Sequence, residues 1–130
     1  MNTGTFGLAT QILKGCGVIA YPTEYCYGLG CDPLNRLAVE RILQMKKRNW
    51  SKGLIVIASD LRQLSGLIDL KKGNFLDEAI SSWPGPYTWV FPARPRAPKW
   101  ICGTHNTLAV RIPDHPIALQ LCRNFRSAIV

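Results

Sequence analysis

The sequence predicts an α/β fold with a largely buried sheet. Short apolar runs at residues 18–21 and 54–58 are typical of strands, and they alternate along the chain with segments that carry helical spacing of apolar residues. The run at 54–58 contains no polar residue, as expected for a strand covered on both faces. The chain has 130 residues and is 47% hydrophobic, which is enough for a core and too apolar for disorder. One α/β domain is therefore expected.

Several segments carry the helical pattern. A first helix is predicted at residues 6–14. Asn35 is a capping residue directly before the next apolar-periodic segment, and further helices are predicted at residues 61–68 and 74–82. Pro116 stands in the first turn of a final helix, where its missing N–H costs no hydrogen bond.

Three more strands are predicted in the second half of the chain. Two are expected at residues 87–91 and 108–112, and the start of another at 127–130. A proline-rich turn at residues 83–86 precedes them. Residues 93–106 combine prolines with cations and are predicted to be a surface loop.

Residues 18–32 mark the place where a binding site is expected. The strand at its start breaks at Pro22, because proline cannot donate to a sheet ladder. A polar, glycine-containing turn then leads toward the helix after Asn35. A strand end, a polar loop and a helix start are where open α/β sheets place their ligands. The segment alone indicates only that a site lies nearby.

Charge and hydropathy restrict the partners of the chain. Sixteen Lys and Arg against eight Asp and Glu give a net charge of +8. This favours anions such as nucleotides, RNA or acidic proteins, unless it is simply a solvated basic surface. No apolar run reaches the length of a membrane span, and the N-terminus lacks a basic-then-apolar signal. We therefore expect no membrane contact and a cytoplasmic location.

Five cysteines are odd in number and form no Cys-x-x-Cys pair. In a reducing compartment they are most simply small, partly buried residues. A zinc site is the alternative, but His105 and His115 lack ligand spacing relative to any cysteine pair. We expect no metal site.

Four cations follow the second predicted helix: Lys46, Lys47, Arg48 and Lys52. Cations at a helix C-terminus are favoured by the helix dipole and are often merely solvated. Alternatively they bind phosphates, for which Arg supplies a planar fork and Lys a point charge. The chain has no GxxxxGK[ST] motif, so a P-loop nucleotide site is excluded.

Arg111 lies on an otherwise apolar strand. Alternation along this strand places Thr107, Ala109 and Arg111 on one face. A buried guanidinium without a partner is costly. Arg111 therefore either forms an internal salt bridge or binds an anionic ligand, for which a carboxylate is a good candidate.

Four motifs occur in a fixed order: YPTEYCYGLGCD, KKR with the following KGLI, WPGPYT, and TLAVRIPDHP. Together they resemble the YrdC-like threonylcarbamoyl-AMP synthase family, and most of all its short, single-domain bacterial form. The resemblance covers nearly the whole chain from about Gly17 onward. It implies a twisted, open, mixed sheet with flanking helices around a basic cavity. It also implies an activity that joins L-threonine, bicarbonate and ATP into threonylcarbamoyl-AMP and pyrophosphate, the first step of threonylcarbamoyladenosine formation in tRNA.

The resemblance assigns roles to individual residues. Thr23 and Tyr27 would line a threonine pocket, and Arg111 would bind the threonine carboxylate. Lys46 and Arg48 would hold the ATP phosphates and bicarbonate, and they are the expected catalytic pair. Lys52 and Thr107 would also contact ATP, and Thr88 would be an additional site residue.

The implied reaction needs no protein nucleophile. A carbamate formed from the threonine amine attacks the α-phosphorus of ATP, so the protein acts by positioning and by neutralising charge. Mg²⁺ would accompany ATP, held mainly by phosphates and water. Cys26 and Cys31 are expected to pack rather than to react. The resemblance further implies tRNA and the other proteins of tRNA threonylcarbamoylation as partners.

In this family the last strand runs on into a Ser-Thr-Ser-Ala-Asn segment with further substrate contacts. We therefore expect residues 1–130 to be a single YrdC-like domain that is incomplete at the C-terminus, with weak or no activity. Full pyrophosphate release by these residues would contradict this expectation.

Two other functions stay open. A non-catalytic RNA-binding module with the same fold would also use a basic surface, with Arg94, Arg96, Lys99 and Trp100 as candidate contacts. Salt-sensitive tRNA binding without ATP turnover would favour it. The other is carbamoyl transfer within a larger enzyme, although the chain carries no zinc-finger or acylphosphatase-like segment.

Overall fold

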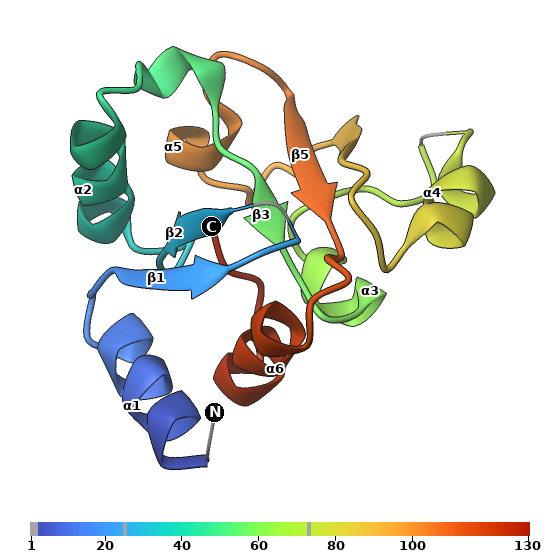
Figure 1. Ribbon diagram of the computed structural model, residues 1–130. Coiled ribbons are helices and arrows are strands. Elements are labelled where there is room, and N and C mark those ends of the chain that lie inside the picture. The colour runs from blue at the N-terminus through green and yellow to red at the C-terminus, as the bar shows by residue number, and fades with distance from the viewer. Residues whose placement is uncertain (1–2, 25, 73) are drawn as a thin grey trace.

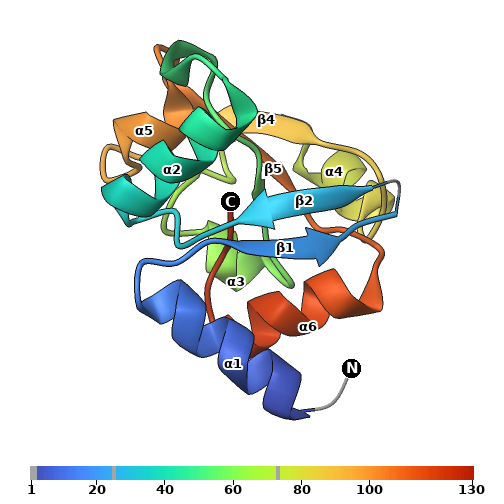
Figure 2. The ribbon, with the colours of Figure 1, turned by 60° about the vertical axis from the view of Figure 1, so that its left-hand side comes forward.

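A two-stranded hairpin and a three-stranded mixed sheet, with helices around them, make up the fold (Figure 1). The computed structural model describes residues 3–24, 26–72 and 74–130, so Tyr25 of the first motif lies outside the described residues. Figure 2 shows α1 (Thr3–Lys14) and α6 (Pro116–Phe125) side by side beneath the hairpin. The described helices include none that is long and apolar enough to cross a membrane.

The hairpin is formed by β1 (Ile19–Pro22) and β2 (Tyr27–Gly30). The prediction that the first strand leads through a loop directly to a helix is therefore wrong. Pro22 is tolerated because each strand of a two-stranded sheet has a free edge, where no N–H needs a partner. The sequence Tyr-Gly-Leu-Gly of β2 has no strand pattern, since glycine is depleted in strands.

Helix α2 (Arg36–Lys46) begins as predicted. The Asn35 side chain accepts a hydrogen bond from the Ala38 N–H at 3.0 Å, which satisfies one of the free donors of the first turn. Lys47 ends the helix in the left-handed conformation, with φ of 51°. The short 3₁₀ helix η1 (Trp50–Lys52) follows.

The three-stranded sheet has the order β3-β5-β4. Strand β5 (Thr107–Arg111) pairs in parallel with β3 (Val56–Ile57) and antiparallel with β4 (Trp89–Pro92). The open, mixed sheet implied by the resemblance is confirmed. The predicted strands are present with bounds shifted or shortened at their ends.

Three short helices complete the described elements: α3 (Leu61–Leu64), α4 (Leu76–Ser82) and α5 (Lys99–Cys102). Helix α3 ends four residues before the predicted 61–68. The prediction of a loop throughout 93–106 is wrong, since α5 lies within it. The helix could not be predicted because one helical turn is too short to show a periodic pattern. The final helix α6 is confirmed, with Pro116 in its first turn.

The segment 128–130 joins the two sheets. Ile129 and Ile57 exchange backbone hydrogen bonds of 2.9 and 2.7 Å, and the Val130 N–H donates to the Cys31 carbonyl at 3.1 Å. The strand predicted at 127–130 is thus present as a single bridge. The Tyr21 hydroxyl donates to the Val130 carbonyl at 3.1 Å from within the smaller of two apolar clusters. The larger cluster contains Leu108 and Val110 of β5.

Gly103 lies where α5 packs closely against η1. Adding a side chain at this position should therefore have a measurable effect on stability. The φ of Gly103 is +70°, and an added Cβ would lie 2.6 Å from the Gly53 amide nitrogen. We expect Gly103→Ala to lower the free energy of unfolding by about 1–3 kcal/mol, because strain and steric overlap act together. Urea unfolding measures this. Gly66→Ala is the matched control, since its Cβ would meet nothing within 4 Å. Equal losses in the two variants would contradict the explanation.

Candidate functional site

Strand β5 is the element that carries the site. Its residues alternate as predicted, with Leu108 and Val110 buried in the core and Thr107, Ala109 and Arg111 half-buried on the opposite face. The polar and charged groups of the strand therefore share one face of the sheet.

Arg111 forms the internal salt bridge that the sequence left open. Its Nη2 contacts the Glu24 carboxylate, and its Nε donates to the Gly85 carbonyl at 2.9 Å. The Arg111 and Glu24 side chains are only 13% and 19% exposed. The second Glu24 oxygen accepts from the Asp114 N–H at 3.1 Å. The pair thus ties together the hairpin turn, the 83–86 turn and the segment after β5.

The pKa of Glu24 lies below its ordinary value of 4.5. Burial alone would raise this pKa, but the backbone N–H groups of Glu24 and Asp114, and then the Arg111 guanidinium, outweigh burial by stabilising the carboxylate. The site therefore holds Glu24 ionised at neutral pH.

This depressed pKa predicts acid-sensitive stability. A carboxyl whose folded-state pKa is lowered stabilises the fold fully above its unfolded-state pKa, near 4.5, and loses this as the pH falls through the folded-state pKa. Glu24→Gln removes the titrating group. We therefore expect the unfolding free energy of the variant to lie below that of the unaltered chain at pH 7, with the gap closing toward pH 3. Urea unfolding across this range checks it, and a constant gap would contradict it.

Thr23 and Tyr27 lie at the two ends of the hairpin turn. The Thr23 hydroxyl donates to the Cys26 carbonyl at 2.7 Å, so it also stabilises the turn. Thr23 directly precedes Glu24, which brings it to the neighbourhood of Arg111. The Tyr27 side chain is 76% exposed. Tyr27 is therefore accessible, but it is not enclosed in a pocket.

A cavity of about 140 Å³ brings together three of the predicted ATP residues: Arg48, Lys52 and Thr107. His105, which the sequence did not assign to the site, also lines it. Lys46 and Thr88 are exposed and are not among the described residues that line this cavity.

The end of α2 positions these cations. The Arg48 N–H donates to the Leu43 carbonyl at 2.9 Å, and the Arg48 Nε donates to the Gly53 carbonyl at 3.0 Å. This turn reverses the chain after the left-handed Lys47. The Asn49 side chain then caps η1 by accepting from the Ser51 N–H at 3.0 Å. Arg48 and Lys52 are therefore held near the first residue of β5.

The cavity and Arg111 lie at opposite ends of one sheet face. Thr107 and Arg111 are four residues apart on β5, which corresponds to about 13 Å along a strand. Between them Ala109 is flanked by Val90, its partner on β4, which is exposed. The face between the two charged ends is therefore open to a ligand.

The cysteines have different environments. Burial raises the pKa of the Cys31 thiol to about 12, with a smaller contribution from Asp32. It is therefore protonated at neutral pH, and the expectation that it packs is confirmed. Cys26 is exposed, so the same expectation is wrong for Cys26. Among the described residues, no three His, Cys, Asp or Glu side chains gather as metal ligands would.

Comparisons with known proteins place the chain in a family. The family model Sua5_yciO_yrdC, described as Telomere recombination, matches residues 11–130. The chain is 48% identical over 123 residues to Threonylcarbamoyl-AMP synthase of Methylococcus capsulatus, covering 95% of this chain and 66% of that protein. It is 47% identical over 122 residues to the protein of the same name from Coxiella burnetii, covering 94% and 66%. The chain thus spans just under two thirds of the length of these curated relatives.

Solved structures agree with the sequence comparison. P. abyssi Sua5 complexed with L-threonine has a TM-score of 0.89 and 34% identity, covering 99% of this chain and 38% of that chain. E. coli YciO has a TM-score of 0.86 and 25% identity, covering 98% and 62%. The fold and the sequence thus lead to one conclusion: the chain belongs to the Sua5/YciO/YrdC family.

Proposed function

We propose that this chain carries threonylcarbamoyl-AMP synthase activity, forming threonylcarbamoyl-AMP and pyrophosphate from L-threonine, bicarbonate and ATP. The observation that carries the proposal is the single face of β5, with Arg111 at one end and the Arg48–Lys52 cavity at the other. The names of the curated relatives and the threonine complex of a structural neighbour support it.

Arg111 is the proposed carboxylate-binding residue for L-threonine. A guanidinium has five N–H donors, and the described contacts use its Nε and one Nη2 donor. Nη1 has no partner among the described residues. These remaining donors suit a carboxylate, while Thr23 and Tyr27 would line the same pocket from the hairpin.

The cavity at the other end is proposed to bind the ATP phosphates. Its 140 Å³ is smaller than the roughly 300 Å³ of a pocket that encloses a whole small ligand, so it suits phosphate groups. Arg48, Lys52 and Thr107 would contact them there. Lys46, at the exposed end of α2, and Thr88, before β4, would contribute from outside the cavity.

The proposed reaction depends on positioning. The carbamate oxygen would attack the α-phosphorus of ATP and expel pyrophosphate, and the cations would stabilise the charge on the phosphates. Mg²⁺ would arrive with ATP and be held mainly by phosphate and water.

Pyrophosphate release tests the proposal. We expect pyrophosphate release, weak from residues 1–130 alone, only when ATP, L-threonine and bicarbonate are all present, with D-threonine as the inactive control. Calorimetric titration with L-threonine and with ATP tests the two ends separately. Absence of both binding and release would overturn the proposal.

The RNA-binding alternative has less support. Arg94, one of its candidate contacts, donates from Nε to the carbonyls of Ser65 and Ile68 at 2.6 and 3.1 Å, so it anchors its own loop. Binding of tRNA, association with other threonylcarbamoylation proteins and a cytoplasmic location stay predictions. The assignment of residues 1–130 to one domain that further residues complete also stays a prediction from the resemblance.

A further inference from the structure

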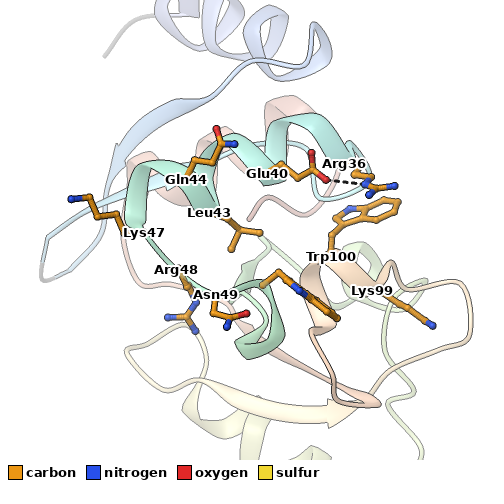
Figure 3. A pocket seen from close by; sticks show the side chains of 10 residues that line it. Arg36, Glu40, Leu43, Gln44, Lys47, Arg48, Asn49, Lys99 and Trp100 are labelled. Atoms are coloured by element: carbon orange, nitrogen blue, oxygen red, sulfur yellow. Dashed lines mark hydrogen bonds and ion pairs between the residues drawn. The ribbon is translucent and has the colours of Figure 1, made fainter.

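A second, larger hollow lies outside the proposed active site. It is a groove of about 810 Å³ between α2 and the segment formed by η1 and α5 (Figure 3). Arg48 is the only described residue that lines both this groove and the 140 Å³ cavity. The groove and the proposed phosphate cavity are therefore adjacent hollows that meet at Arg48.

Cations stand at both ends of the groove. Figure 3 shows Lys47 and Arg48 at one end and Arg36 and Lys99 at the other. Glu40 is the single acidic residue among the described residues of the lining, and it pairs with Arg36 at 2.9 Å. Lys47 and Lys99 have no carboxylate partner among the described residues. The groove thus carries net positive charge at two separated points.

The middle of the groove is apolar. Leu43 lies between the charged ends, and the Trp100 indole is fixed because its Nε1–H donates to the Pro33 carbonyl at 2.8 Å. Trp50, on η1, is 52% exposed. Two indoles therefore border an apolar floor.

One exposed apolar side chain of α2 lies beside the groove. Leu37 is three residues before the lining residue Glu40, which places the two on neighbouring positions of the helix surface, and it is 64% exposed. Trp, Met and Arg are the residue types enriched in protein interfaces. Indoles also stack nucleic-acid bases, so the feature that favours another protein is the apolar Leu43 between them, which matches an apolar side chain.

We propose that this groove binds an acidic segment of another protein. An apolar side chain of the segment packs against Leu43 between the two indoles, and carboxylates on either side of it pair with Lys47 and Lys99. The charge pattern selects an acidic partner, and the apolar floor at Leu43 favours a side chain of another protein. This inference does not depend on the proposed enzymatic activity.

Nuclear magnetic resonance tests the site directly. The probe is an acetylated, amidated peptide of three Glu-Glu-Leu-Leu repeats, titrated into the ¹⁵N-labelled chain. We expect the indole N–H signals of Trp50 and Trp100 to shift. Those of Trp83 and Trp89, whose indoles donate to Tyr87 and Ser82 outside the groove, stay in place and report the fold. The matching Lys-Lys-Leu-Leu peptide is expected to cause no shift.

Charge reversal supplies the second readout. Lys47→Glu/Lys99→Glu is expected to weaken binding of the acidic peptide at least tenfold, and Trp50→Ala to weaken it independently of charge. Lys71→Glu/Lys72→Glu is the matched control, because it changes the same charge at exposed residues outside the groove. Unchanged affinity in the first two variants would overturn the proposal. So would tighter binding of a twelve-nucleotide oligouridylate that shifts the same two indole signals.

Discussion

Replacing Arg111 by glutamine is expected to weaken L-threonine binding by about 10- to 150-fold and to leave ATP binding unchanged. Each charge-assisted hydrogen bond contributes about 1.5–3 kcal/mol, and tenfold in affinity corresponds to about 1.4 kcal/mol. The remaining guanidinium donors are the groups that would hold the carboxylate. Calorimetric titration with each substrate measures the two affinities separately. Arg111→Lys keeps the charge but loses the planar fork, so its threonine affinity should lie between those of the unaltered chain and of Arg111→Gln.

A structural effect must be separated from this loss of binding. Arg111→Gln leaves the largely buried Glu24 carboxylate without its cation, which itself destabilises the fold. The double variant Glu24→Gln/Arg111→Gln removes both charges, so much of the lost unfolding free energy should return. Threonine affinity should stay low. If the double variant regained threonine binding, Arg111 would act only as a structural partner of Glu24.

Local patterns were sufficient to predict the elements that are formed by local interactions. The Asn35 cap, the helix at Pro116 and the alternation of β5 all follow from residue types at fixed spacing, and the structure confirms them. Strand β2 and helix α5 could not be predicted from local patterns, because each depends on contacts with another part of the chain. The first is glycine-rich and is held by pairing with β1, and the second is a single turn held against η1.

The site likewise depends on contacts between residues that are far apart in sequence, which local patterns do not predict. The sequence predicts that Arg111 needs an anionic partner, because an isolated guanidinium on an apolar strand is unfavourable. It does not identify Glu24, which lies 87 positions away along the chain. His105 lies in a loop segment with no periodicity, so only the folded chain brings it to the cavity. The groove between α2 and α5 likewise depends on a helix that the pattern does not reveal.

Arg48 provides the second large effect, at the opposite end of the β5 face. We expect Arg48→Gln to weaken ATP binding by about 10- to 150-fold, since it removes a charged donor from the phosphate cavity. L-threonine binding should change little, because Arg111 lies about 13 Å along the strand from this end. Titration with ATP and with inorganic pyrophosphate measures the change, and both ligands should lose affinity together if phosphates are what Arg48 binds.

Lys47→Gln is the matched control for this experiment. It makes the same change of charge one residue away, but Lys47 lines the groove and not the phosphate cavity. An electrostatic effect of the whole basic surface would weaken ATP binding equally in both variants and would fall steeply with salt. A contact at the cavity weakens binding only in Arg48→Gln. Equal losses in the two variants would therefore contradict the assignment of the phosphates to this cavity, even if the chain binds ATP.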